Sequence, residues 1–302
     1  MQNSNLKSSI CWRVGTCGIS DSDWIGNFYS RGLRTIDRLG YYAERFNAIE
    51  LNTTFHAIPR REYVKRWTDV TPPNFRFSVK FLKEVTHGPS DYLVAAQTLE
   101  TAKRFFDVIQ ELGEKLAIVF MLFPPWFSAI HRPTLLQLLD RISCPARLVI
   151  EFRNDSWWTP TTANALRERN IGWVAADLGS FPLVAEVPVK GRLLPFGLRP
   201  IISTTDFLYA RWLGKHLQFP EHTEERFDST PRVAWWLERL MHVTKSYPNI
   251  RDVYAFFDND FSGHAPTAAR RFADKVNLRC GSEVPLKVGQ PSPCGRNQFL
   301  WE

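Results

Sequence analysis

The stretch LVIEFR at residues 148–153 decides the fold of this 302-residue chain, and the stretch AIELN at residues 48–52 repeats its pattern. Apolar and polar side chains alternate in both, which is typical of a β-strand whose two faces meet different surroundings. Glu50 and Asn52 share one face, and Glu151 and Arg153 share the equivalent face. We expect the apolar faces to pack under helices and these four polar side chains to point into a barrel.

Six further β-rich stretches occur along the chain, with amphipathic helical patterns between them. Strands that alternate with helices predict a parallel sheet, and eight such units close an α/β barrel of the TIM-like (β/α)₈ class. The eight strands are expected at Arg13–Gly18, Ala48–Asn52, Arg76–Phe81, Leu116–Phe123, Arg147–Arg153, Gly172–Asp177, Phe207–Leu213 and Asp252–Asp258.

The predicted barrel is one domain at residues 12–277, between a flexible N-terminus at residues 1–11 and a tail at residues 278–302. Its irregular part is the segment between strands six and seven, Leu178–Asp206, which contains four prolines and no convincing helical pattern. We interpret this segment as a long excursion and a candidate lid.

Composition restricts the class of protein. The chain is 44% hydrophobic and 23% charged, which is typical of a globular protein. Its longest apolar run, Leu116–Phe123, is too short for a membrane helix, and the polar residues 1–9 contain no signal core. We therefore expect a cytoplasmic protein without a membrane partner. The five cysteines form no CxxC motif, so we expect reduced thiols and no zinc finger.

A formal net charge of +7 suits an anionic partner, either a small molecule or a nucleic acid. The positive residues are spread along the chain and form no basic arm. The charge therefore indicates a class of partner and does not locate the site. The oligomeric state is left open.

Charged residues recur where the predicted strands end. Lys80 closes the third strand, Asp177 closes the sixth, and Arg211 lies late in the seventh. Barrel enzymes build their active sites from these ends. A purely structural network of ion pairs is the alternative. The candidate catalytic residues are Glu50, Lys80, Glu151 and Asp177, and the candidate substrate-binding residues are Thr16, Asn52, Arg153, Arg211, Asn259, Gly263 and His264.

The loop after the eighth strand, residues 258–266, leads into a predicted helix. Gly263 allows a close approach, and free N–H groups at a helix start favour a phosphate. His264 is a candidate proton donor, metal ligand or capping residue. Asp258 and Asp260 also suit turn or cap positions.

Five motifs together resemble the YecE-like family, known as domain of unknown function 72, over about residues 12–276. The family's GTSGW, FNTVEINSTFY, FxFxxK, EFRHxSW and NNDxxGHAP segments correspond to Gly15–Ile19, Phe46–His56, Phe75–Lys80, Glu151–Trp157 and Asp258–Pro266. The resemblance implies a fold similar to a TIM barrel and no particular reaction.

This chain departs from the family pattern at four places. His56 stands where the family has Tyr, Leu122 where a Gln precedes Leu-Pro-Pro, and Asp258 where it has the first Asn; the Pro-rich stretch before strand seven is also longer. The loss of that Gln removes a polar group from the expected pocket, so the ligand or activity of this chain is expected to differ.

Three hypotheses for the function follow. The first is an enzyme, a hydrolase or lyase, acting on a phosphate-bearing substrate such as a nucleic-acid phosphodiester. In this hypothesis Arg153, Arg211 and the loop at Gly263 and His264 hold the anion, and Glu50 or Glu151 is the base. The second is a non-catalytic nucleotide or nucleic-acid binding module. The third is an aldolase-like enzyme that forms a Schiff base at Lys80.

The cofactor is left open, and a divalent metal is possible without being favoured. Carboxylates and a histidine in the same region would suit a divalent ion. The neighbouring Lys and Arg residues already supply positive charge there, and one histidine is well placed. The candidate ligands are Glu50, Glu151, Asp177, Asp260 and His264.

Overall fold

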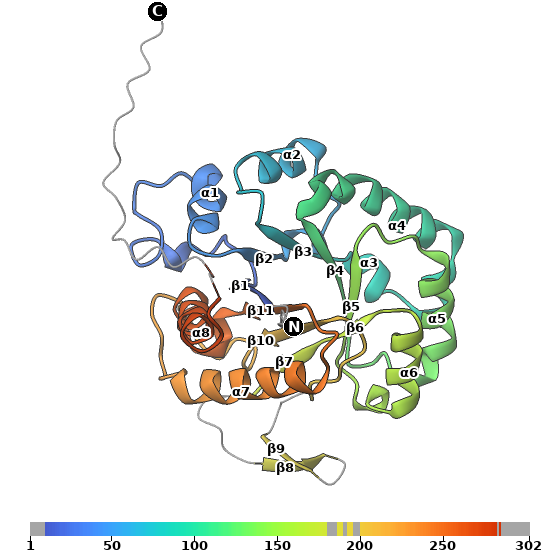
Figure 1. The fold of residues 1–302 in the computed structure, drawn as a ribbon. Coiled ribbons are helices and arrows are strands. Elements are labelled where there is room, and N and C mark those ends of the chain that lie inside the picture. Colours follow the sequence, from blue (N-terminus) through green and yellow to red (C-terminus); the bar gives the residue numbers. More distant parts are fainter. Residues whose placement is uncertain (1–9, 180–185, 190–191, 196–199, 283, 285–302) are drawn as a thin grey trace, which may run out of the picture.

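The computed structural model describes residues 10–179, 186–189, 192–195, 200–282 and 284. Within these ranges parallel strands and surrounding helices form a TIM-like barrel, which confirms the predicted fold (Figure 1). The barrel strands are β1 Cys11–Thr16, β2 Ala48–Leu51, β3 Arg76–Lys80, β4 Leu116–Phe123, β5 Arg147–Phe152, β6 Gly172–Trp173, β7 Ala175–Asp177, β10 Phe207–Trp212 and β11 Asp252–Phe257.

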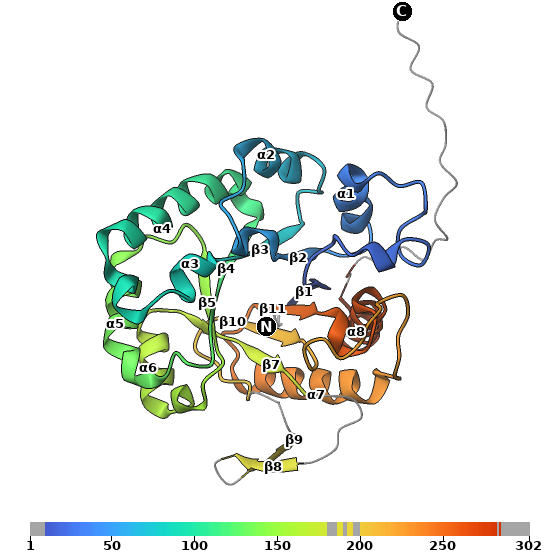
Figure 2. The same ribbon diagram turned by 180° about the vertical axis from the view of Figure 1, so that it is seen from behind.

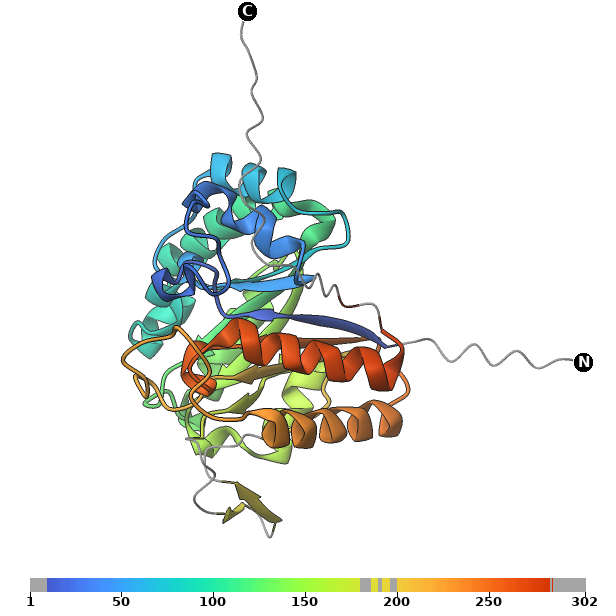
Figure 3. The same cartoon turned by 90° about the vertical axis from the view of Figure 1, so that its left-hand side faces the viewer.

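The sixth predicted strand is present as two short strands, β6 and β7, on either side of Val174. This interruption divides the barrel into two sheets, with strand orders β2-β3-β4-β5-β6 and β1-β11-β10-β7. All pairings within the two sheets are parallel. The carboxyl ends of the strands therefore lie at one end of the barrel, as the side view in Figure 3 shows.

Helices form the outer ring, seen from both ends in Figures 1 and 2. Proline lies in the first turn of α5, α6, α7 and α8, where a missing N–H has no cost. The helices are α1 Arg38–Ala43, α2 Arg61–Asp69, α3 Lys83–Thr86, α4 Ala96–Ile109, α5 Arg132–Arg141, α6 Pro160–Glu168, α7 Thr230–Ser246 and α8 Ala265–Cys280.

The strands separate two hydrophobic layers. Ile49 and Leu51, like Ile150 and Phe152, pack with the helices in the outer layer, as the alternating pattern predicts. The second layer fills the barrel itself, so the barrel is a packed core rather than a pore. The buried residues of this inner layer are Ala48, Ile118, Phe120, Val149, Val174, Ala176, Phe207, Tyr209, Tyr254 and Phe256.

The barrel closes between β1 and β2 through one backbone bridge, Cys17 with Glu50, and through side chains. Asn47 accepts a hydrogen bond from the backbone N–H of Val14 at 2.8 Å and donates one to the carbonyl of Trp12 at 2.8 Å. The hydroxyl of Tyr42 accepts from the N–H of Thr16 and donates to the carbonyl of Ala48. These bonds satisfy backbone groups that a regular ladder would otherwise pair.

The excursion between β7 and β10 contains an antiparallel hairpin, β8 Glu186–Val189 and β9 Arg192–Pro195. Figure 1 shows this hairpin outside α7, whereas a lid would lie over the strand ends. At the termini, β1 already begins at Cys11 and α8 continues to Cys280, beyond the predicted barrel limits. The rest of the predicted N-terminus and tail, residues 1–9, 283 and 285–302, lies outside the described residues.

Within the described ranges, the helices all fall short of the length and apolar character needed to cross a bilayer.

Replacing Asn47 tests the side-chain closure of the barrel. Asn47→Ala leaves a buried N–H and a buried carbonyl without partners, so we expect the free energy of unfolding to fall by about 3 kcal/mol. The matched control is Asn164→Ala on the exposed face of α6, which should change it by less than about 0.5 kcal/mol. Urea unfolding of both variants measures the difference; equal losses would contradict the role of Asn47.

Candidate functional site

Arg211 of β10 occupies the centre of the barrel mouth. Its guanidinium donates two hydrogen bonds to the carboxylate of Glu50, at 2.8 and 2.7 Å, and a third to Glu151 at 2.6 Å. All three side chains are at most 3% exposed. The ring of Phe120 lies beneath the guanidinium, 4.5 Å from its carbon. A buried cation is thus held between two buried carboxylates and an aromatic face.

Two hydroxyl groups extend this network into the barrel. Tyr209 donates to Glu50 at 2.7 Å, and its hydroxyl lies 2.7 Å from that of Ser78. Burial, and then the neighbouring carboxylate of Glu50, raise the pKa of Tyr209 well above its usual value. The phenol therefore remains protonated and serves as a donor. Glu50 accepts three hydrogen bonds in all, one from Tyr209 and two from Arg211, and they occupy both of its carboxylate oxygens.

Arg153 binds Glu151 from the solvent side of the same network. The guanidinium of Arg153 forms an ion pair with Glu151, and its side chain is 27% exposed. Burial opposes ionisation of Glu151, but Arg153 and Arg211 together hold its pKa below the usual value. Glu151 is therefore an ionised partner of two arginines, which is a poor arrangement for a general base at neutral pH.

Lys80 is the cation of the mouth that forms no ion pair with any described residue. Its ammonium lies 4.2 Å from the centre of the Phe55 ring and 5.8 Å from that of Phe120. Burial, followed by the charge of Arg211, lowers the pKa of Lys80 to about 8. His87 lies near Lys80 and Arg153, and burial together with these charges lowers its pKa to about 4. The imidazole is therefore neutral beside a charged ammonium at pH 7.

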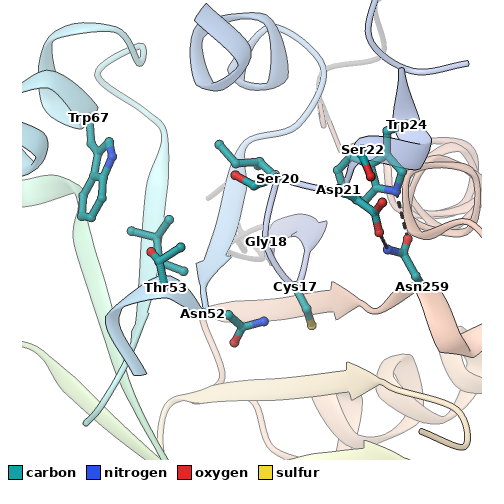
Figure 4. Close-up of a pocket in the computed structure, with 12 residues that line it drawn as sticks. Cys17, Gly18, Ser20, Asp21, Ser22, Trp24, Asn52, Thr53, Trp67 and Asn259 are labelled. Atoms are coloured by element: carbon teal, nitrogen blue, oxygen red, sulfur yellow. Dashed lines mark hydrogen bonds between the residues drawn. The ribbon is translucent and has the colours of Figure 1, made fainter. Parts of the chain in front are cut away.

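A groove of about 500 Å³ lies over the ends of β1 and β2 (Figure 4). Asn52 and Cys17 point into it, and the side-chain oxygen of Asn52 is buried without a hydrogen-bond partner among the described residues. Burial and the charge of Glu50 raise the pKa of Cys17 well above its usual value, so its thiol is not a nucleophile at neutral pH. The side-chain oxygen of Asn52 can therefore accept a hydrogen bond from a ligand in this groove.

A smaller pocket of about 330 Å³ adjoins the arginine network on the other side of β11. Arg153, Lys215 and His216 line it together with the carboxyl groups of Asp258 and Asp260. Basic and acidic groups thus share one small cavity at the strand ends.

Thr16 and Asp177 face the helices rather than the mouth, contrary to our expectation. Asp177 accepts hydrogen bonds from Arg232 at 2.6 Å and Trp236 at 2.8 Å, both on α7. Thr16 bonds to Tyr42 of α1. Both residues therefore join the barrel to its outer helices, and we do not include them in the site.

The loop before α8 is covered by other parts of the chain. Gly263 has φ +103°, and a Cβ on it would lie 2.7 Å from the carbonyl oxygen of Glu224. His264 is 5% exposed and its Nδ1 lies 2.7 Å from the hydroxyl of Thr267; burial lowers its pKa to about 4. The structure therefore does not support an anion site at Gly263 and His264.

Asn259 connects two loops at the edge of the groove. Its amide nitrogen donates to Asp21 at 2.6 Å, while its oxygen accepts from the indole of Trp24 and from the N–H of Ala265 (Figure 4). Because of these three hydrogen bonds, Asn259 holds the wall of the groove in place. Its predicted contact with a substrate stays a prediction.

The predicted metal ligands do not come together. Glu50 and Glu151 are bound by Arg211, and Asp177 is bound by Arg232. In the part of the chain that the structure describes, a different set, Asp21, Asp23 and His222, has ligand atoms within 4.8 Å of one another. These three residues already bond among themselves: the imidazole Nδ1 of His222 lies 3.1 Å from the carboxylate of Asp21, and the backbone N–H of His222 donates to Asp23 at 2.8 Å.

Several members of the network around Arg211 were not predicted from the sequence. Tyr209 and Ser78 lie two residues before Arg211 and Lys80, so strand alternation would have placed them on the same inner faces. Phe55 and His87 lie outside the strands, where no periodicity applies. Leu122 also faces the inner layer, which places an apolar group where the family pattern has Gln.

Comparison with known proteins agrees with the motifs. The family described as "Protein of unknown function DUF72" matches residues 13–292. The chain belongs to the DUF72 family. Its match continues past residue 277, where we expected the barrel domain to end.

DUF72 relatives support the same assignment. UPF0759 protein YunF of Bacillus subtilis (strain 168) is 29% identical over 299 residues, 91% of this chain and 98% of YunF. UPF0759 protein YecE of Escherichia coli (strain K12) is 28% identical over 147 residues, 47% of this chain and 53% of YecE. A crystal structure of a DUF72 family protein from Thermotoga maritima MSB8 has a TM-score of 0.69 at 26% identity, covering 88% of this chain and 99% of that chain.

Substituting Arg211 should lower the stability of the fold. In Arg211→Met two buried carboxylates lose their main counter-charge, so we expect a loss of about 3–5 kcal/mol in the free energy of unfolding. Arg153→Met should lose less, because Arg153 is partly exposed and Glu151 keeps Arg211. Chemical denaturation of both variants tests this order, and the reverse order would exclude Arg211 as the centre of the network.

Proposed function

We propose that the barrel mouth binds and transforms a phosphate-bearing substrate, as a hydrolase or lyase, with nucleic-acid phosphodiesters as one substrate class. Lys80 and Arg153 would hold the anion, and Asn52 would orient the rest of the substrate from the adjoining groove. Arg211, Glu50 and Glu151 would keep these groups in place. The position at the strand ends supports an active site, because that end of a barrel carries the chemistry.

The unpaired ammonium of Lys80 is the observation on which this proposal depends. Arg153 and Arg211 are paired with Glu50 and Glu151, whereas Lys80 forms no ion pair with any described residue. Keeping a charge without a partner in a partly buried place costs free energy. An anionic ligand would offset that cost by supplying the missing counter-charge, which a purely structural network would not need.

The alternative within this proposal is that the same charged residues bind a nucleotide or nucleic acid without catalysing a reaction. Salt-dependent binding of a nucleotide or oligonucleotide that is recovered unchanged would favour that alternative.

Lys80→Met tests the anion site without disturbing the arginine network. Wild type, Lys80→Met and the matched control Lys83→Met, an exposed lysine of α3, are heated with phosphorylated sugars, nucleotides, short oligonucleotides and divalent ions. We expect at least one phosphate compound to raise the Tm of wild type and Lys83→Met but not of Lys80→Met. No shift in any protein would contradict the proposed anionic substrate.

The pH dependence of that binding gives a second readout. The ammonium of Lys80 is the form that attracts an anion, and its pKa in the free protein is about 8. Binding should therefore be retained below pH 8 and lost as the pH rises through that value. Titration calorimetry of the best ligand between pH 6 and pH 9.5, in buffers of constant ionic strength, measures the change.

The lowered pKa of Lys80 also favours a second candidate function, Schiff-base chemistry with a carbonyl substrate. A lysine amine becomes a better nucleophile when burial lowers its pKa toward neutrality. With dihydroxyacetone phosphate and sodium borohydride as probes, this function predicts a stable adduct on the peptide that contains Lys80. Mass spectrometry detects it, and Lys80→Arg serves as the control; an unmodified Lys80 peptide would exclude this function for that probe.

A further inference from the structure

Asp258, at the end of β11, is a carboxyl group of the mouth that the network around Arg211 does not use. It follows Phe256 by two residues and so shares the inner face of the barrel. It forms no ion pair with any described residue, whereas Glu50 and Glu151 are both bound to arginine. Its Oδ1 accepts the N–H of Asp260 at 3.2 Å, which fixes the orientation of the carboxyl group.

The surroundings of Asp258 allow it to hold a proton near neutral pH. Burial raises its pKa to about 6, with smaller opposing effects from the N–H of Asp260 and the charge of Arg211. Asp260 and Glu50 repel the ionised form, and so favour the proton. The charged or titratable groups facing Asp258 are Cys17 just after β1, Glu50 on β2, Arg211 on β10, Asp260 in the following turn, and Arg153, Lys215 and His216 across the pocket.

The pocket that Asp258 lines also contains groups suited to an anion. Arg153 and the exposed Lys215 reach the same cavity of about 330 Å³. A phosphate held there would place one of its ester oxygens within the cavity that Asp258 lines. Glu50 and Glu151 both accept hydrogen bonds from Arg211, and neither of them lines this pocket.

We propose that Asp258 is the general acid of this site, which donates its proton to the departing oxygen of a phosphate ester that Arg153 binds together with Lys80 and Lys215. This inference rests on the proposed function and adds a catalytic residue to it. Water attacks phosphorus and the bond to the leaving oxygen breaks. That oxygen keeps the electron pair and takes the proton of Asp258. The proton released by the attacking water then restores the carboxyl group, so the cycle consumes one water and no other reactant.

A leaving-group comparison tests the role of Asp258. The probes are methyl phenyl phosphate, whose basic phenolate needs a proton to depart, and methyl p-nitrophenyl phosphate, whose nitrophenolate leaves as a stable anion. We expect Asp258→Asn to slow hydrolysis of the phenyl ester by about 100-fold and to affect the nitrophenyl ester much less. Asp274→Asn, an exposed carboxyl on α8, is the matched control and should leave both rates unchanged.

The pH profile provides an independent readout. Hydrolysis of the phenyl ester by wild type should fall as the pH rises above about 6, because Asp258 must be protonated, and this limb should disappear in Asp258→Asn. Equal slowing of both esters, or of neither, would overturn the role of Asp258 and leave the proposed function standing. If wild type hydrolyses neither ester and Lys80→Met binds phosphate as wild type does, the proposed function itself fails.

An NMR titration of the Asp258 carboxyl carbon tests the protonation of Asp258 without requiring any hydrolysis. In protein labelled with carbon-13 at the aspartate carboxyl groups, the signal missing from Asp258→Asn belongs to Asp258. We expect this signal to titrate near pH 6. A midpoint at the ordinary aspartate value would overturn the inference even if an ester is hydrolysed, because an ionised carboxylate cannot act as the acid.

Discussion

The triple hydrogen bond of Arg211 to Glu50 and Glu151 is the interaction on which the barrel mouth depends. The three groups come from β10, β2 and β5, so one guanidinium ties together strands from both sheets of the barrel. Each ion would be unstable in this buried place without the others. Because the geometry of one planar guanidinium fixes two carboxylates, the mouth has a defined shape before any ligand enters.

This pairing also decides which groups are left for chemistry. A carboxylate bound by arginine is a poor base, and a guanidinium bound by two carboxylates has little capacity left for a ligand. Lys80 and Asp258 stand outside the pairing, and burial moves the pKa of each toward neutrality from opposite sides. A site that contains both a cation and a carboxyl group with shifted pKa values is suited to proton transfer near pH 7. The structural network and the reactive groups are therefore different residues within one mouth.

Strand alternation predicted much of this arrangement, and its limits are equally physical. It placed Glu50, Glu151, Lys80 and Arg211 in the mouth because residues two apart share a face of a strand. It would also have excluded Asp177, since Val174 and Ala176 fill the inner layer, but small residues on both faces hid the pattern. The partner of Asp177, Arg232, lies 55 residues away on a helix, and Glu224 and Arg226, which cover Gly263, are also remote from it in the sequence. Long-range contacts of this kind are not encoded in periodicity.

The two buried arginine–carboxylate systems also separate stability from function. Asp177 with Arg232 lies between the barrel and α7, and Asp177 also accepts a hydrogen bond from Trp236 of that helix. Arg211 with its two glutamates lies beside a groove and a pocket, with an unpaired lysine and a protonatable aspartate at its edge. Burying charge costs free energy in both systems. For Asp177 and Arg232, the packing of α7 against the barrel explains why buried charges are present. The second continues to Arg153, which is 27% exposed and lines the pocket beside it, and for that reason we assign the chemistry to the barrel mouth.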